Sequence, residues 1–166
     1  MVSMGGLRDL LTGLGMQDVR TLLQSGNVVF RSSAAPDALE KKLQAAIAKE
    51  LGVDVEFFVR TPTEWGALIA ANPFPEHAAR DPGHLLVMFL KDAVSAKAVA
   101  ALQDAIKGRE IVRAKGRQAY IYYVDGVGRS KLTNSLIEQK LGTRATGRNW
   151  NTVLKLGALA GGSRSA

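Results

Sequence analysis

Residues 125–131 (Asp-Gly-Val-Gly-Arg-Ser-Lys) combine the residue types that bind anions, and they join a predicted strand to a predicted helix. Two glycines allow a sharp turn, and free backbone N–H groups beside two cations suit a phosphate or a carboxylate. The alternative is an ordinary turn with solvated basic side chains, because the spacing fits neither a Walker A loop nor a dinucleotide fingerprint. The candidate residues are Gly128, Arg129, Ser130 and Lys131, and Ser130 is the expected cap of the helix.

Residues 146–152 form a second polar segment, built around a single aromatic side chain. Asn149 is expected to cap the last helix, and Trp150 is expected to pack in the core. Capping and burial leave Arg148 unexplained. A guanidinium beside a helix N-terminus recognises planar anions, so Arg148 and Asn149 are candidate ligand residues. Arg148 would converge with Arg129 if the ends of their strands are neighbours.

The excess of positive charge lies in the second half of the chain. Residues 1–83 carry eight Lys/Arg against ten Asp/Glu, whereas residues 84–166 carry fourteen against five. This asymmetry favours acidic partners, nucleic acid above all. The candidate contacts are Arg113, Lys115 and Arg117 together with Arg129, Lys131 and Arg148 of the two anion segments.

Tyr120 is a further nucleic-acid candidate, because it lies on a strand position where RNA-recognition motif domains present stacking aromatics. The segment 115–123 resembles the first ribonucleoprotein motif of those domains, with one extra residue and without its first aromatic. The alternative is that the ring packs in the core or between the two halves, which is the more common fate of a strand tyrosine.

Residues suited to catalysis or metal binding are few. His77 and His84 flank a predicted linker with Asp81 between them, but histidines in a polar loop are usually exposed, and no metal site is expected. Gln24 and Asn27 lie in a predicted hairpin turn, where they would either reach a pocket or serve the turn itself. No carboxylate pair or nucleophile elbow is apparent, so the sequence predicts no reaction and no cofactor.

The first half of the chain reads as helix, hairpin, helix, strand and helix. Apolar periodicity, β-branched runs and glycine stops define these elements. They are expected at 3–14 (helix), 19–23 and 28–30 (hairpin), 36–51 (helix), 53–59 (strand) and 61–69 (helix).

The second half reads as βαββαβ followed by one more helix, which is the ferredoxin-like order. Its elements are expected at 84–91 (strand), 95–106 (helix), 110–115 and 118–124 (hairpin), 130–141 (helix), 143–146 (strand) and 149–160 (helix). We therefore predict an α+β protein of two ferredoxin-like halves related by internal duplication, although so common an order also recurs by chance. The predicted divisions are 1–75, a linker at 76–83, 84–160 and a flexible tail at 161–166.

The first half lacks a counterpart of the strand at 84–91. In a ferredoxin-like sheet that strand is central, so its absence would leave backbone groups of two strands unpaired. We expect Met1 to be an internal methionine of a longer natural product whose upstream residues supply the strand. Otherwise a second copy would fill the place in a homodimer.

The composition excludes several classes of protein. There is no cysteine, which rules out disulfides and zinc sites built on thiolates. The longest unbroken apolar run, 85–90, is too short to span a bilayer, and no membrane partner is expected. A cytoplasmic location fits these features best.

Three motifs in order resemble the bacterial domain of unknown function 1697 family. They are Leu-Leu-Gln-Ser-Gly-Asn-Val-Val-Phe at 22–30, Gly-Arg-Ser-Lys-Leu-Thr-Asn at 128–134 and Arg-Asn-Trp-Asn-Thr-Val at 148–153. The resemblance implies a ferredoxin-like α+β protein of two subdomains, and no reaction, because the family is uncharacterised. It also implies an opening strand and a Gly-rich loop, which this chain lacks. It draws attention to Gln24, Asn27, Arg129, Lys131, Arg148 and Asn149.

Two hypotheses of function follow. One is a non-enzymatic module that binds nucleic acid or another polyanion through the basic second half. The other is a small-molecule site, open to catalysis, in which Arg129, Lys131 and Arg148 hold a phosphorylated or carboxylated ligand near Gln24 and Asn27.

Overall fold

The computed structural model of the chain divides into two compact units. It describes residues 4–22 and 26–164, with side chains for residues 5–22 and 26–160. The first unit comprises Met1–Gly66 and Lys155–Ala166, and the second comprises Ala67–Leu154. The chain passes between them within α3 (Pro62–Ala70) and again within α7 (Trp150–Arg164). Within the described residues, no helix has both the length and the apolar character needed to span a membrane.

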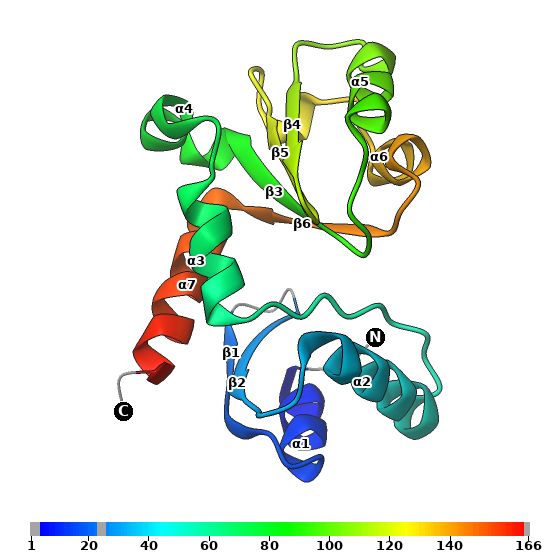
Figure 1. Cartoon of the computed structure of the whole chain (residues 1–166), viewed down its shortest axis with the longest axis vertical. Helices are drawn as coiled ribbons and strands as arrows, with labels where there is room; N and C mark the ends of the chain where they lie inside the picture. The colour runs from blue at the N-terminus through cyan, green and yellow to red at the C-terminus, as the bar shows by residue number, and fades with distance from the viewer. Residues whose placement is uncertain (1–3, 23–25, 165–166) are drawn as a thin grey trace. The chain divides into compact units, whose positions relative to one another are not determined.

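The second unit contains a four-stranded antiparallel sheet with β3 (Leu85–Leu90) in its interior. The strand order is β4-β5-β3-β6, and α5 (Ala96–Ala105) and α6 (Asn134–Leu141) lie on the same face of the sheet (Figure 1). This is the ferredoxin-like arrangement predicted for the second half. The other strands are β4 (Ile111–Lys115), β5 (Gln118–Tyr122) and β6 (Ala145–Asn149).

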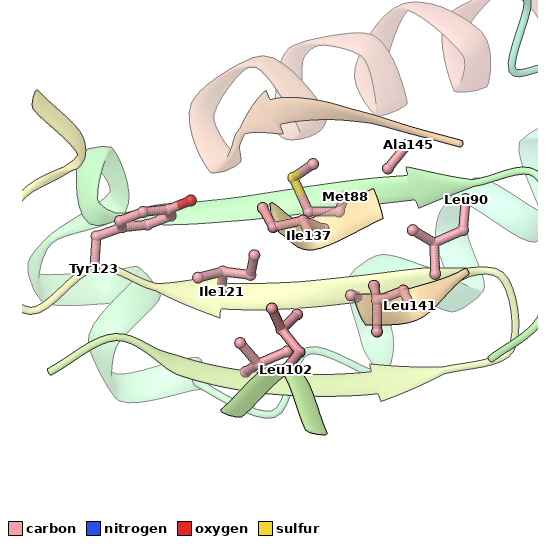
Figure 2. Close-up of a cluster of buried hydrophobic side chains, with 10 residues drawn as sticks. Met88, Leu90, Leu102, Ile121, Tyr123, Ile137, Leu141 and Ala145 are labelled. Atoms are coloured by element: carbon pink, nitrogen blue, oxygen red, sulfur yellow. The ribbon is translucent and has the colours of Figure 1, made fainter. Parts of the chain in front are cut away.

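Strand alternation explains the core of this unit. Met88 and Leu90 of β3 and Ile121 of β5 point to the helix-covered face, where they meet Leu102 of α5 and Ile137 of α6 (Figure 2). Successive side chains of a strand lie on opposite faces, so the intervening residues of β3 and β5 form the other face. That face is also buried, since Val87 and Tyr120 have almost no exposed surface.

The segment before α6 differs from the prediction. The helix begins at Asn134, and the hydroxyl of Thr133 caps it by accepting from the N–H of Leu136 at 3.1 Å. Ser130 is not the cap, because its hydroxyl donates to the carboxylate of Glu110 at 2.6 Å. Residues 127–129 form instead a short 3-10 helix, η2.

The last strand also differs from the prediction, since β6 runs to Asn149 and not to residue 146. The polar segment 146–149 therefore belongs to a strand. The cause is pairing with β3, because Val87 lies opposite Arg148 and Leu86 lies opposite Asn149. The segment expected to be a flexible tail is helical as far as Arg164, the end of α7.

The predicted linker carries structure of its own. Residues 76–83 lie mostly in α4 (Pro75–Arg80) and in the 3-10 helix η1 (Pro82–His84), and both belong to the second unit. Proline at the first turn starts each of these helices. The ring of His77 stacks on the ring of Tyr122, with centroids 4.1 Å apart, which fixes α4 against β5.

The first unit has the predicted helices and hairpin. An antiparallel pair forms between β1 (Gln17–Leu22) and β2 (Asn27–Arg31), flanked by α1 (Met4–Gly13) and α2 (Pro36–Leu51) (Figure 1). Gly52 ends α2 with a φ of 66°, a left-handed conformation that favours glycine. The buried core residues are Leu7, Leu11, Met16, Leu39, Leu43 and Ile47.

The strand predicted at 53–59 does not form, although its burial pattern is as expected. Val55 and Val59 pack against the core of the first unit, but the segment joins neither described sheet. Side chains of α2 occupy the place of a neighbouring strand. The N–H of Phe57 donates to Gln44 Oε1 at 3.0 Å, and the N–H of Val59 donates to Glu40 Oε2 at 2.7 Å.

Glu40 also faces a buried cation. Arg60 Nη1 lies 3.7 Å from Glu40 Oε2, and the two side chains are only 2% and 10% exposed. Removing one member of a buried ion pair leaves the other without compensation, which is more damaging than losing an exposed pair. Glu40 is therefore expected to support both the extended segment and Arg60.

We predict that Glu40→Ala destabilises the first unit by about 3–5 kcal/mol, because it removes the buried carboxylate that faces the Arg60 guanidinium and that accepts from the Val59 N–H. Denaturant unfolding measures the loss, and amide exchange at Val59 reports the local effect. Glu40→Gln should lose less, because its carbonyl still accepts from Val59. Glu50→Ala, at an exposed position of α2, should change stability by less than about 0.5 kcal/mol. Equal effects of Glu40→Ala and Glu50→Ala would contradict the assignment.

Candidate anion-binding surface

Basic residues gather at the end of the second unit's sheet where β3 ends. Backbone hydrogen bonds hold three chain segments side by side there. The N–H of Leu90 donates to the carbonyl of Arg117 at 2.9 Å, and the N–H of Lys91 donates to the carbonyl of Arg144 at 3.0 Å. Lys115 pairs with Gln118 across the β4–β5 hairpin, which adds the fourth segment. We call Lys91, Lys115, Arg117 and Arg144 the basic end.

The basic end places one cationic residue on each of four neighbouring chain segments, in the order Lys115, Arg117, Lys91 and Arg144. Adjacent strands lie about 4.8 Å apart, so the row of backbone positions extends over about 14 Å. Lys115 and Arg144 are exposed, and Lys91 and Arg117 are partly exposed. A row of this kind matches an extended ligand with regularly repeated negative charge better than it matches a single small anion.

Two carboxylates lie near the basic end, and both accept hydrogen bonds from the protein. Asp92 Oδ2 accepts from the hydroxyl of Thr143 at 3.4 Å. Glu138 Oε2 accepts from the N–H of Ala145 at 2.8 Å and lies 3.8 Å from Arg144 Nε. Four cations against these two carboxylates leave the basic end with a net positive charge.

A tight hairpin presents part of this surface. Gly116 has a φ of 63°, the left-handed conformation that a two-residue hairpin turn requires, and the turn directs Lys115 and Arg117 to the tip. Arg113, also exposed, precedes them on β4, and its Nη1 donates to the carbonyl of Val112 at 2.9 Å. Thus the hairpin brings together three residues predicted as nucleic-acid contacts.

Sequence reasoning missed Lys91 and Arg144. Lys91 is the last residue of the predicted strand 84–91 and Arg144 lies within the predicted strand 143–146, both outside any basic cluster of the sequence. The sequence signal for Lys91 was that it follows the apolar run 85–90, and Arg144 had no such signal. Pairing of β3 with its two neighbours is what brings them beside the hairpin.

The predicted anion segment 125–131 lies at the opposite end of the sheet, where β3 begins. Arg109 donates from Nε to Asp125 Oδ2 at 3.0 Å, and its Nη2 contacts the other carboxylate oxygen. The hydrogen bond from Arg109 holds the pKa of Asp125 below its ordinary value, and the charges of Arg129 and His84 act in the same direction. Arg129 thus lies near a carboxylate of the chain itself.

Ser130 anchors this segment through Glu110, while Arg129 and Lys131 on either side of it are exposed. The Glu110 carboxylate is buried and lies against the backbone of Gly108, where a Cβ would come within 2.3 Å of one carboxylate oxygen. Gly128 has open space around it. The serine therefore fixes the loop that presents the two cations.

Arg148 and Asn149 lie on β6, so they and Arg129 flank β3 on opposite sides at the same end of the sheet. Arg148 Nη1 donates to the Gly147 carbonyl at 2.7 Å and to Thr146 Oγ1 at 3.2 Å. Burial lowers the pKa of Arg148. Asn149 Oδ1 accepts from the N–H of Asn151, which is a capping contact at the start of α7.

Tyr120 lies in the core. Its ring is 1% exposed, and its hydroxyl donates to the carbonyl of Leu68 at 2.5 Å. Burial raises the pKa of Tyr120 to about 12. Burial, followed by the charge of Glu110, likewise raises the pKa of Tyr123 to about 12.

The remaining candidates are Asn27, Gln24 and the two histidines of the predicted linker. Asn27 is buried and donates from Nδ2 to the Leu22 carbonyl at 3.2 Å, across the β1–β2 hairpin. Gln24 lies outside the described residues. His84 has a buried Nδ1 without a hydrogen-bond partner. In the part of the chain that the structure describes, no three His, Cys, Asp or Glu side chains group in a way that would hold a metal ion.

We predict that the second unit loses stability between about pH 10 and about pH 12. The raised pKa of Tyr123 favours its neutral form when folded. Its contribution is complete below about pH 10 and is lost as the pH rises towards 12, because the unfolded chain ionises first. Chemical denaturation at a series of pH values measures the loss. Tyr123→Phe should reduce the slope, and parallel curves for the variant and the wild type would contradict the prediction.

The comparisons with known proteins concern family and fold. The chain is similar to a conserved bacterial protein from Streptococcus pneumoniae of known structure, with 20% identity and a TM-score of 0.69. The match covers 96% of this chain and 89% of the other, and at this identity it shows a shared fold alone. No curated protein matches the sequence.

The family comparison agrees with the resemblance noted in the sequence. The model of the family described as "Protein of unknown function (DUF1697)" matches residues 1–120, which is more than half of the chain. The matched residues include the motif at 22–30, the interior strand β3 of the second unit and most of its β4–β5 hairpin. The chain therefore belongs to the DUF1697 family.

Proposed function

We propose that the second unit binds nucleic acid or another phosphate-rich polyanion through the basic end, without catalysing a reaction. The observation that carries this proposal is the row of four cationic residues on four neighbouring segments of one sheet. A nucleic-acid strand carries one phosphate per about 3.4 Å of helix axis, so a row of about 14 Å can face about four phosphates. The excess of positive charge in residues 84–166 supports the same proposal.

We further propose that the two halves of the sequence arose by internal duplication. The order α1-β1-β2-α2-α3 in the first half parallels α5-β4-β5-α6-α7 in the second, with 53–60 in the place of β6. Arg60 and Arg148 then occupy corresponding positions before helices that contain Trp65 and Trp150. On this proposal, the first half is a ferredoxin-like unit without the counterpart of β3.

The alternative is a small-molecule site at Arg129, Lys131 and Arg148. The anchoring of Ser130 to Glu110 favours it, because a fixed loop with two exposed cations suits a phosphorylated or carboxylated ligand. Against it stand the Asp125 carboxylate beside Arg129 and the contacts of Arg148 within its own strand.

Fluorescence anisotropy with a labelled single-stranded RNA tests the proposal. Four phosphate contacts predict a slope of about −2.8 in a plot of log affinity against log salt, or about fifty-fold weaker binding at 200 mM than at 50 mM salt. Lys115→Ala should bring the slope to about −2.1, because one contact is lost. Lys115→Ala with Arg117→Ala should bring it to about −1.4.

Lys131→Ala is the matched control, because it removes one exposed charge from the same unit at the opposite end of the sheet. If binding uses only the basic end, this variant keeps all of the about four phosphate contacts, and the slope should stay at about −2.8. The absence of binding at low salt would refute the proposal. If Lys131→Ala or Arg129→Ala abolishes binding while Lys115→Ala has no effect, the alternative site is favoured. A thermal-shift screen of nucleotides and phosphorylated metabolites then tests that site.

A further inference from the structure

The second unit exposes no Phe, Tyr or Trp ring on which a base can stack. The structure describes all of residues 67–154, and each Phe, Tyr and Trp side chain among them is no more than 7% exposed. Proteins that bind unstacked bases stack them on exposed aromatic side chains. The aromatic residues concerned are Phe74, Phe89, Tyr120, Tyr122, Tyr123 and Trp150.

Contacts inside the unit cover the sheet face that an RNA-recognition motif would use. Tyr120 donates its hydroxyl to the Leu68 carbonyl, and the Tyr122 ring already stacks on His77 at a 13° interplanar angle. Phe74 lies beside both of the latter rings, with centroids about 6 Å away. These contacts commit the rings to packing, so a bound strand would have to break them before a base could stack.

The groups at the basic end recognise charge. Lys91 and Lys115 are ammonium donors that bind phosphate as point charges, and Arg117 and Arg144 add guanidinium donors. The two guanidinium planes are the remaining groups in the row that could stack on a base. Arg144 is directed to Glu138, with Nε 3.8 Å from the carboxylate.

We infer that the basic end binds the phosphate chain alone and does not distinguish bases. The inference rests on the proposed function and narrows its ligand to a linear chain of phosphates, with either a sugar–phosphate backbone or inorganic polyphosphate as its source. Phosphate contacts position a ligand and carry no sequence information directly. Affinity should therefore follow the number and spacing of phosphates and not the bases.

The test compares three probes of equal charge on the full chain at low salt. They are a mixed-sequence RNA, a deoxyribose-phosphate oligomer that lacks all bases, and inorganic polyphosphate. The abasic oligomer should bind within about threefold of the RNA, because one stacked base would by itself contribute roughly fivefold to 140-fold. Homopolymers of uridine and adenosine should also agree within about threefold.

A double variant separates the contribution of charge from that of stacking on a guanidinium plane. Arg117→Lys combined with Arg144→Lys keeps both charges and removes both planes, so affinity for RNA should stay within about threefold. Each outcome has a separate meaning. Abasic binding more than about tenfold weaker than RNA binding overturns the inference and leaves the proposed function standing. If the chain binds none of the three probes, both the inference and the proposed function are overturned. With RNA and the abasic oligomer binding alike, a difference above about tenfold between polyphosphate and the abasic oligomer identifies the source of the phosphate chain and supports the inference.

Discussion

The interior position of β3 is the constraint on which the second unit depends. This strand pairs with β5 on one side and with β6 on the other, and both of its faces are buried. A strand that is buried on both faces reads as a continuous apolar run, and Leu-Leu-Val-Met-Phe-Leu is such a run. Both of its backbone edges are used as well, so its two ends determine which segments meet.

The two ends of β3 differ in chemistry for that reason. Where β3 ends, the hairpin of β4 and β5 and the start of β6 converge, and each contributes a cation. Where β3 begins, Arg109 binds Asp125, and Arg148 binds carbonyl and hydroxyl oxygens of β6. The row of four cationic residues at the other end is the arrangement that suits a ligand with many charges.

The first unit shows what happens to a strand pattern that has no described neighbour. Residues 53–59 keep the alternation of a half-buried strand, and their apolar side chains reach the core. Backbone N–H groups that approach a protein interior need acceptors, and Glu40 and Gln44 of α2 supply them. Hydrogen bonds to side chains of α2 take the place of the hydrogen bonds that a neighbouring strand would make. This arrangement buries the Glu40 carboxylate beside Arg60.

The sequence by itself determined the helices other than α4, the two hairpins and the βαββαβ order of the second half, because periodicity, proline starts and glycine stops are local signals. It also located the excess charge in that half, and it identified the family motifs from residue order alone. Tertiary structure decided which charges stand together, because Lys91 and Arg144 are 53 positions apart in the sequence and meet only through strand pairing. It likewise decided that Tyr120 is a core residue and that Ser130 binds Glu110 in place of capping α6. Each of these outcomes depends on contacts between residues far apart in the chain, which no local pattern encodes.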